Sequence, residues 1–254
     1  MADAKAPLRK RDRLKARAKR HVNLPLSLKT ADLPRRAASA VVMLAIAGTA
    51  VWRGGAVLDG FIALVAVACL VEFVLLVMRG TRSLPLRLAA ILGGAAYIGL
   101  AALGLARLDP YHVIAVLGVV IFTDTCAYFA GRAIGGPKIA PRISPSKTWA
   151  GLAGGMVGSA AWLATYMAIA HNDAGAARLA DSFDITGGEA LGWVLLGALL
   201  AIAAQMGDFF ESWLKRRAGK KDSSNLIPGH GGVFDRIDGL LPVALIVGLL
   251  AAYA

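Results

Sequence analysis

Seven apolar runs, separated by short polar stretches, take up most of this 254-residue chain. About 20 apolar residues in a helix cross the hydrocarbon core of a bilayer, where irregular backbone exposed to lipid is not tolerated. Hydrophobic residues make up 57% of the chain, whereas charged residues make up 17%, below the roughly 25% of average soluble domains. The sequence therefore predicts an all-α, polytopic integral membrane bundle of about seven transmembrane helices. The expected spans are Ala37 to Trp52, Ala56 to Met78, Leu88 to Ala106, Pro110 to Gly131, Trp149 to Ala170, Ala190 to Phe210 and Phe234 to Ala254.

The basic residues fall almost entirely on one side of this predicted bundle. If all seven runs cross, only Arg53, Arg107 and Arg178 lie on the far side, and the other 25 Lys and Arg residues share the side of the N terminus. Positively charged loops stay on the cytoplasmic side of a membrane. We therefore expect a bacterial-type inner membrane protein with its N terminus cytoplasmic and its C terminus outside.

Residues 1–36 form a strongly basic arm, with 12 Lys or Arg against three Asp. The arm has no apolar core of signal-peptide length. A basic arm can bind nucleic acid, but the membrane domain expected over 37–254 favours contact with anionic lipid and no nucleic-acid partner. The acidic segment 171–189 is read as an external loop without a catalytic role.

The stretch from 208 to 238 concentrates five carboxylates and six basic residues between two apolar runs. Ionisable groups are expensive inside a bilayer, so such a cluster indicates a functional site. Asp208 and Glu211 have i, i+3 spacing, as do Asp235 and Asp238, which places each pair on one helix face. Several carboxylates together suit Mg²⁺, which takes substrate phosphates as further ligands. The site is predicted at the cytoplasmic face.

Cations and glycines surround these carboxylates. Lys215, Arg216, Lys221 and Arg236 would balance phosphate charge, and the glycines of the 229–232 segment would let backbone approach a ligand. This combination is typical of phosphoryl or nucleotidyl transfer. His230 is read either as a residue that orders the loop or as a contact to phosphate or metal.

Two upstream features point to the same face. Asp124 lies eight residues before Arg132, about 12 Å inside the predicted helix end. Two interpretations stay open for it, a residue of the functional site or the structural ion-pair partner of an Arg on a neighbouring helix. The second feature is the proline-rich loop 135–151, whose Ser144, Ser146, Lys147 and Thr148 are expected to open the next helix. A helix start with hydroxyls and a Lys can bind phosphate, although the same pattern also forms an ordinary N-cap.

The residues resemble the phosphatidate cytidylyltransferases, also called CDP-diacylglycerol synthases. The signature consists of Ser212, Lys215, Arg216, Lys221, Asp222, Pro228, His230, Gly231, Gly232, Asp235, Arg236 and Asp238. Upstream, Asp124, Tyr128, Gly131, Arg132, the 144–148 segment and Asp208 with Glu211 also resemble that family. The long signature is specific, whereas the N-terminal half resembles the family only as apolar spans.

The resemblance implies that phosphatidate attacks the α-phosphorus of CTP and that pyrophosphate leaves. It implies Mg²⁺, alone or with a monovalent cation, as cofactor. The expected catalytic residues are Lys215, Arg216, Lys221, Asp222, Asp235 and Arg236. Expected substrate contacts are Ser144, Ser146, Lys147, Thr148, His230, Gly231 and Gly232, and expected metal ligands are Asp222, Asp235, Asp238, Asp208 and Asp124. Small-residue helix faces are compatible with a homodimer.

Two other functions stay open at this point. A CTP-dependent polyprenol or phytol kinase is similar in fold and nucleotide, but it would phosphorylate an alcohol and release CDP. A cation transporter would use intramembrane carboxylates, but these would be distributed across the membrane depth. Here the acidic residues collect near one face, with Asp124 and Glu72 the deepest.

Overall fold

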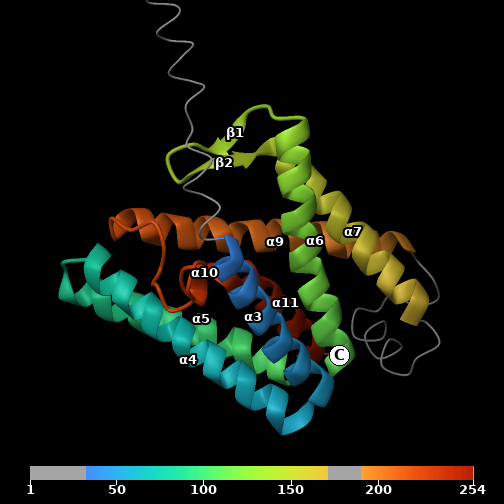
Figure 1. Ribbon diagram of the computed structural model, residues 1–254, viewed down its shortest axis with the longest axis horizontal. Coiled ribbons are helices and arrows are strands. Elements are labelled where there is room, and N and C mark those ends of the chain that lie inside the picture. The colour runs from blue at the N-terminus through green and yellow to red at the C-terminus, as the bar shows by residue number, and fades with distance from the viewer. Residues whose placement is uncertain (1–32, 171–189, 254) are drawn as a thin grey trace, which may run out of the picture.

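The computed structural model describes residues 33–170 and 190–253. Eight helices and one two-stranded antiparallel sheet make up this part of the chain (Figure 1). The helices are α3 (Leu33–Arg53), α4 (Gly55–Gly80), α5 (Leu84–Ala106), α6 (Pro110–Ala133), α7 (Trp149–Ala170), α9 (Ala190–Arg217), α10 (Phe234–Ile237) and α11 (Leu240–Tyr253). The strands are β1 (Lys138–Ala140) and β2 (Ser144–Thr148). Most of the basic arm and the whole 171–189 segment lie outside the described residues.

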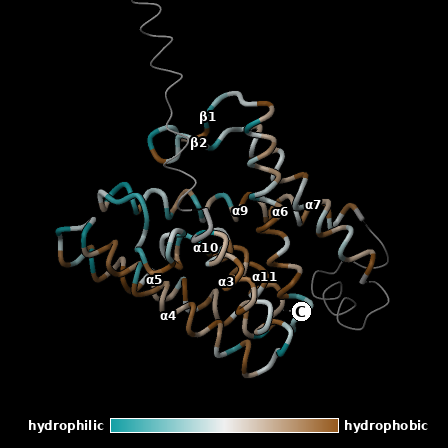
Figure 2. Tube along the Cα trace, viewed as in Figure 1, coloured by the Kyte–Doolittle hydropathy of each residue, from teal (hydrophilic) through white to brown (hydrophobic). Residues whose placement is uncertain are grey.

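The predicted class, a helical polytopic membrane protein, is confirmed. Six described helices, α3, α4, α5, α6, α7 and α9, are long and apolar enough to cross a membrane. Figure 2 shows the hydrophobic colour along these helices, with hydrophilic residues gathered at loops and helix ends. Six of the seven expected spans therefore correspond to long helices in the structure.

The seventh expected span, Phe234 to Ala254, is wrong as one continuous helix. The chain forms the four-residue α10, breaks at Asp238 and Gly239, and then forms the 14-residue α11. At 1.5 Å per residue α11 is about 21 Å long, shorter than a typical hydrocarbon core of about 30 Å. The break packs against the middle of α9, where a Cβ on Gly207 would lie 2.1 Å from the carbonyl oxygen of Asp238. The acidic residues of this segment are thereby brought beside α9.

The predicted helix start at residues 144–148 is also wrong. These residues form β2, which pairs with β1, and α7 begins only at Trp149. Thr148 alone acts as an N-cap residue does, because its Oγ1 accepts a hydrogen bond from Gly151 N at 3.0 Å. The three prolines of this loop leave the hairpin short, and Figure 1 shows it at the end of the bundle above α6 and α7.

The described helices pack as two groups. In one, α6, α7 and α9 are joined through small residues, and a Cβ on Gly154 would lie 3.0 Å from Cys126 O. In the other, α4, α5 and α11 pack together, and a Cβ on Gly248 would lie 2.4 Å from the Cα of Gly104. Such close approach is common between membrane helices. The segment between α9 and α11 lies where the two groups meet.

Candidate active site

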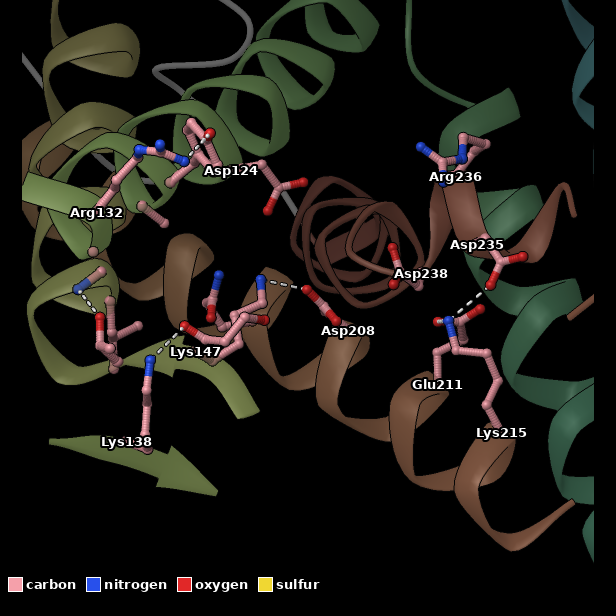
Figure 3. A pocket seen from close by; sticks show the side chains of 18 of the residues that line it. Asp124, Arg132, Lys138, Lys147, Asp208, Glu211, Lys215, Asp235, Arg236 and Asp238 are labelled. Atoms are coloured by element: carbon pink, nitrogen blue, oxygen red, sulfur yellow. Dashed lines mark hydrogen bonds and ion pairs between the residues drawn. The ribbon is translucent and has the colours of Figure 1, made fainter. Parts of the chain in front are cut away.

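A polar cavity of about 510 Å³ opens between α6, the β hairpin, α9 and the 222–238 segment (Figure 3). Its wall carries six carboxylates and five cationic side chains, although it is surrounded by apolar helices. The charged residues are Asp124, Asp208, Glu211, Asp222, Asp235 and Asp238, with Arg132, Lys138, Lys147, Lys215 and Arg236. The structure thus brings together acidic residues that are up to 114 positions apart in the sequence.

Two lysines pair with carboxylates across the cavity. Lys147, from β2, makes an ion pair with Asp208 of α9. Lys215 pairs with Glu211 on its own helix and, at 2.7 Å, with Asp235 Oδ1 on α10. The hairpin and α10 are therefore both tied to α9 by charge-assisted contacts, which are stronger than neutral hydrogen bonds.

Three carboxylates, Asp124, Asp208 and Asp238, form what we call the acidic trio. Within the described residues Asp124 makes no hydrogen bond or ion pair, and Asp238 accepts only from Gly239 N, at 2.8 Å. Burial, together with the nearby carboxylates of Asp208 and Asp124, raises the pKa of Asp238 to about 7. Negative charge at the acidic trio is thus incompletely compensated by protein groups.

Asp235 has a different environment, because it holds the signature segment in place. Its Oδ2 accepts from Ser223 N at 2.9 Å, from Ser223 Oγ at 2.9 Å and from Gly232 N at 2.8 Å. Burial acts to raise the pKa of Asp235, but hydrogen bonds with Glu211, Lys215 and these N–H groups hold it well below its usual range. Asp235 is therefore ionised and fully engaged.

Glu72 of α4 is the second residue that holds this segment, and no role for it was predicted. The side chain is 3% exposed. It accepts from Val233 N at 3.1 Å, from Phe234 N at 2.8 Å and from Ser224 Oγ. Its Oε2 also lies 2.9 Å from Ser223 Oγ, so it shares the hydroxyl hydrogen of Ser223 with Asp235. We call Glu72, Ser223 and Asp235 the loop anchor. A carboxylate inside an apolar run was the available signal, but its partners are more than 150 residues away.

Gly232 is required by this loop anchor. A Cβ at that position would lie 1.9 Å from Ser223 Oγ and 2.4 Å from Glu72 Oε2. The neighbouring Gly231 has φ +84°, a conformation that other residues rarely adopt. These glycines were predicted to let a ligand approach the backbone. In this structure the close packing at Gly232 and the positive φ of Gly231 are sufficient to explain why glycine is needed at both positions.

The carboxylates of the cavity fit a divalent cation in their chemistry, although they are not arranged as a closed ligand shell. Within the described residues no three His, Cys, Asp or Glu side chains come together as a metal-binding group. Glu211 Oε1, however, is buried with no hydrogen-bond partner among those residues. Hard oxygen donors with uncompensated charge are what Mg²⁺ prefers.

Several predicted site residues lie outside the cavity wall. The Nδ1 atom of His230 is hydrogen-bonded to Ser39 Oγ of α3 at 2.8 Å. This contact favours the interpretation of His230 as a residue that orders the loop. Arg216 is exposed and donates to Ile143 O at 3.4 Å. The cavity wall also excludes Ser144, Lys221, Gly231 and Gly232, whereas Ser146, Lys147 and Thr148 line it.

Comparison with known proteins identifies the family of the chain. Residues 107–254 match the model of the Cytidylyltransferase family. The chain belongs to this family. Every residue that lines the polar cavity falls within the matched range, whereas Glu72 precedes it.

Similar proteins from several bacteria share the name phosphatidate cytidylyltransferase. The chain is 42% identical over 165 residues to the phosphatidate cytidylyltransferase of Brucella suis, covering 63% of this chain and 56% of the relative. It is 40% identical over 136 residues to that of Haemophilus influenzae, with 52% and 44% covered. The Pseudomonas aeruginosa protein is 42% identical over 129 residues, with 50% and 42% covered. The chain spans about half the length of the curated relatives it matches.

Proposed function

We propose that this protein transfers the cytidylyl group of CTP to phosphatidate, forming CDP-diacylglycerol and pyrophosphate. The observation that carries the proposal is the cavity of mixed carboxylates and cations inside a membrane bundle, in a chain of the Cytidylyltransferase family. The relatives named phosphatidate cytidylyltransferase supply the choice of lipid substrate.

In the proposed reaction, a phosphate oxygen of phosphatidate forms a bond to the α-phosphorus of CTP. The bond from that phosphorus to the β-phosphate oxygen breaks, and its electron pair leaves with pyrophosphate. A phosphate anion is already nucleophilic, so the protein needs to supply no base. Its task is to hold two polyanions together and to stabilise the charge that grows on the leaving group.

The cationic side chains of the cavity suit this task. Lys147 and Lys215 each reach across the cavity to a carboxylate, so their ammonium groups are held where a phosphate oxygen could share them. Arg132 and Lys138 extend the positive wall toward the hairpin, and Arg236 stands on the opposite side (Figure 3). We assign Lys147, Lys215 and Arg236 to phosphate contact.

We assign the acidic trio, Asp124, Asp208 and Asp238, to holding Mg²⁺. When bound, the ion would neutralise nucleotide phosphate charge and orient the reacting phosphorus. Asp222 also lines the cavity and stays in the predicted ligand set. Asp235 was predicted in that set too, but both of its oxygens accept hydrogen bonds from the protein, so we place it in the loop anchor.

We further propose that the cavity faces the cytoplasm. Arg132 and Lys138 line the cavity. Arg79 and Arg217 lie in the last turns of α4 and α9, and these ends share the side of the Arg132 end of α6 if all six long helices cross the membrane. The positive-inside tendency puts that side in the cytoplasm, where CTP is present.

The test is transfer of label from CTP into lipid. Purified protein in detergent is incubated with α-³²P-labelled CTP, phosphatidate and Mg²⁺, and the lipid phase is counted. We expect labelled CDP-lipid whose formation stops on chelation with EDTA. Release of labelled CDP only when a polyprenol or phytol is supplied, with no lipid label from phosphatidate, would replace the proposal by a lipid kinase.

A further inference from the structure

A second cavity, of about 400 Å³, lies behind α3 and is almost wholly apolar. Its walls come from α3, α4, α5, α6 and α11, and it extends along α3 from Met43 to Val51. Met43 and Val51 are eight positions apart, which corresponds to about 12 Å of helix. The volume lies within the range of about 300–1,000 Å³ that is usual for ligand pockets.

Arg236 connects this apolar cavity to the polar one, because its side chain lines both. Val233 and Ile237, on the same segment as Arg236, also line the apolar cavity, whereas Asp235 and Asp238 face the polar one. The α10 segment is thus a partition with a charged wall on one side and an apolar wall on the other. Arg236 itself stands where the two cavities meet.

The helix that covers the apolar cavity packs loosely. In the apolar part of α3 that is long enough to cross a membrane, only 6% of the residues are buried, compared with 33% in α4. Near its start, Ser39 Oγ contacts His230 Nδ1 at 2.8 Å and donates to Pro228 O at 3.0 Å. One end of α3 is thereby attached to the signature segment, while the rest offers a thin wall between the cavity and surrounding lipid.

We propose that this apolar cavity receives an acyl chain of the phosphatidate whose phosphate lies beside Arg236 in the polar cavity. The inference rests on the proposed function and adds where the lipid binds. A phosphatidate molecule combines an anionic phosphate with apolar chains, and only a site that joins a cationic group to an apolar pocket complements both parts.

The other large apolar cavity of the described residues fits this role less well. It has a volume of about 520 Å³ and lies between α4, α5 and α9. Phe210 and Trp213 line it from α9, on a different face from Asp208, Glu211 and Lys215. Within the described residues it shares no lining residue with the polar cavity, so a lipid chain there would have its phosphate elsewhere.

A pair of substitutions on α3 tests the proposal by activity. Ala47 lines the cavity, whereas Ala45 is exposed on the same helix and does not. Ala47→Phe is expected to raise KM for dioleoyl phosphatidate roughly ten-fold, through lost burial of a few methylene groups, and to leave KM for dihexanoyl phosphatidate unchanged. Ala45→Phe is the matched control and should change neither KM. Equal effects on both substrates, or no effect of Ala47→Phe, would overturn the proposal.

A binding measurement separates this inference from the proposed reaction. Phosphatidate carrying a diazirine along one acyl chain is photolysed with the full-length wild-type protein in the absence of CTP. We expect cross-links in the α3 peptide that contains residues 43–51, reduced in Ala47→Phe. Cross-links in the 86–94 region of α5, which lines the other apolar cavity, would overturn the inference, as would equal labelling by phosphatidylcholine with the same chain. Cross-links at α3 without cytidylyl transfer would preserve the lipid site and reject the proposed reaction.

Discussion

The two carboxylates of the loop anchor and the three of the acidic trio all belong to one membrane bundle, yet their hydrogen bonding differs greatly. Glu72 has four donors within hydrogen-bond distance and Asp235 Oδ2 has three, and the Ser223 hydroxyl, with one hydrogen, is shared between the two carboxylates. In the acidic trio, Asp238 has one backbone donor and Asp124 has none among the described residues. A buried charge with a complete set of donors holds structure, whereas one without them is available to a cation or a ligand. Substitutions should therefore separate folding from activity.

The largest effect is expected from Glu72→Ala. Removal of the carboxylate would leave the N–H groups of Val233 and Phe234 and the hydroxyl of Ser224 without their acceptor, whereas the Ser223 hydroxyl keeps Asp235 as its acceptor. At about 1–3 kcal/mol for each unsatisfied buried group, we expect destabilisation on the order of 3–5 kcal/mol. Thermal unfolding in detergent measures it. Asp59→Ala, an exposed acidic position on the same helix, is the control and should stay within about 0.5 kcal/mol. Equal stability of the two variants would remove Glu72 from the loop anchor.

Asp238→Asn should have the opposite signature, with activity lost and folding kept. The amide preserves shape and removes the charge, so we expect the thermal midpoint without metal to be unchanged or higher. Cytidylyl transfer should fall at least about 100-fold, because electrostatic stabilisation of the transition state depends on the ion held there. Mg²⁺ should raise the thermal midpoint of the wild type and not of the variant. A variant that keeps both activity and the Mg²⁺ response would show that Asp238 is not a ligand.

Gly232→Ala probes the loop anchor without changing any charge. The new methyl group would overlap Ser223 Oγ and Glu72 Oε2, so we expect destabilisation of about 1–3 kcal/mol. Gly60→Ala is the matched control, since nothing lies within 4 Å of a Cβ there and Ala is favoured in a helix by about 0.5–1 kcal/mol. The two midpoints should move in opposite directions. Movement in the same direction would contradict the close packing at Gly232.

The pKa of Asp238 predicts how stability depends on pH when metal is removed. The folded-state pKa of about 7 lies above that of an exposed Asp, so folding favours the protonated form. This stabilisation is fully present below the unfolded-state pKa of about 4 and is lost as pH rises through about 7. Between pH 6 and pH 8, EDTA-treated wild type should therefore lose more thermal stability than Asp238→Asn. Parallel pH curves for the two proteins would contradict a raised pKa at this residue.

The smallest effect is expected from Ser39→Ala. The hydroxyl contacts His230 and Pro228, and loss of such partly exposed hydrogen bonds costs about 0.5–1.5 kcal/mol. Activity should change less than three-fold, because His230 lies outside the cavity wall. Thermal unfolding and initial rates measure the two quantities. A large loss of activity with stability preserved would instead give His230 a role at the substrate.

The sequence predicted much of the fold because the controlling signals are local. Apolar runs of membrane length correspond to α3, α4, α5, α6, α7 and α9. The predictions failed where distant contacts decide the conformation. The 234–254 run is apolar enough for one helix, but the contact of Gly207 with Asp238 accompanies a break. Ser144 to Thr148 has the composition of a helix start, and pairing with β1 makes it a strand.

The candidate site divides in the same way. Residue types and spacing alone indicated a charged functional cluster, and Asp124, Asp208, Asp235 and Asp238 indeed line one cavity. Their separate roles could not be predicted, because the sequence of a motif does not show which groups donate hydrogen bonds to each Asp in the folded protein. The partners of Glu72 lie at least 151 residues further along the chain, and the partner of Lys147 in β2 lies on α9. Patterns of hydrophobicity and charge involve neighbouring residues and can therefore be recognised in the sequence. The hydrogen-bond donors to a buried carboxylate come from distant segments, so only the tertiary structure decides whether its charge is compensated.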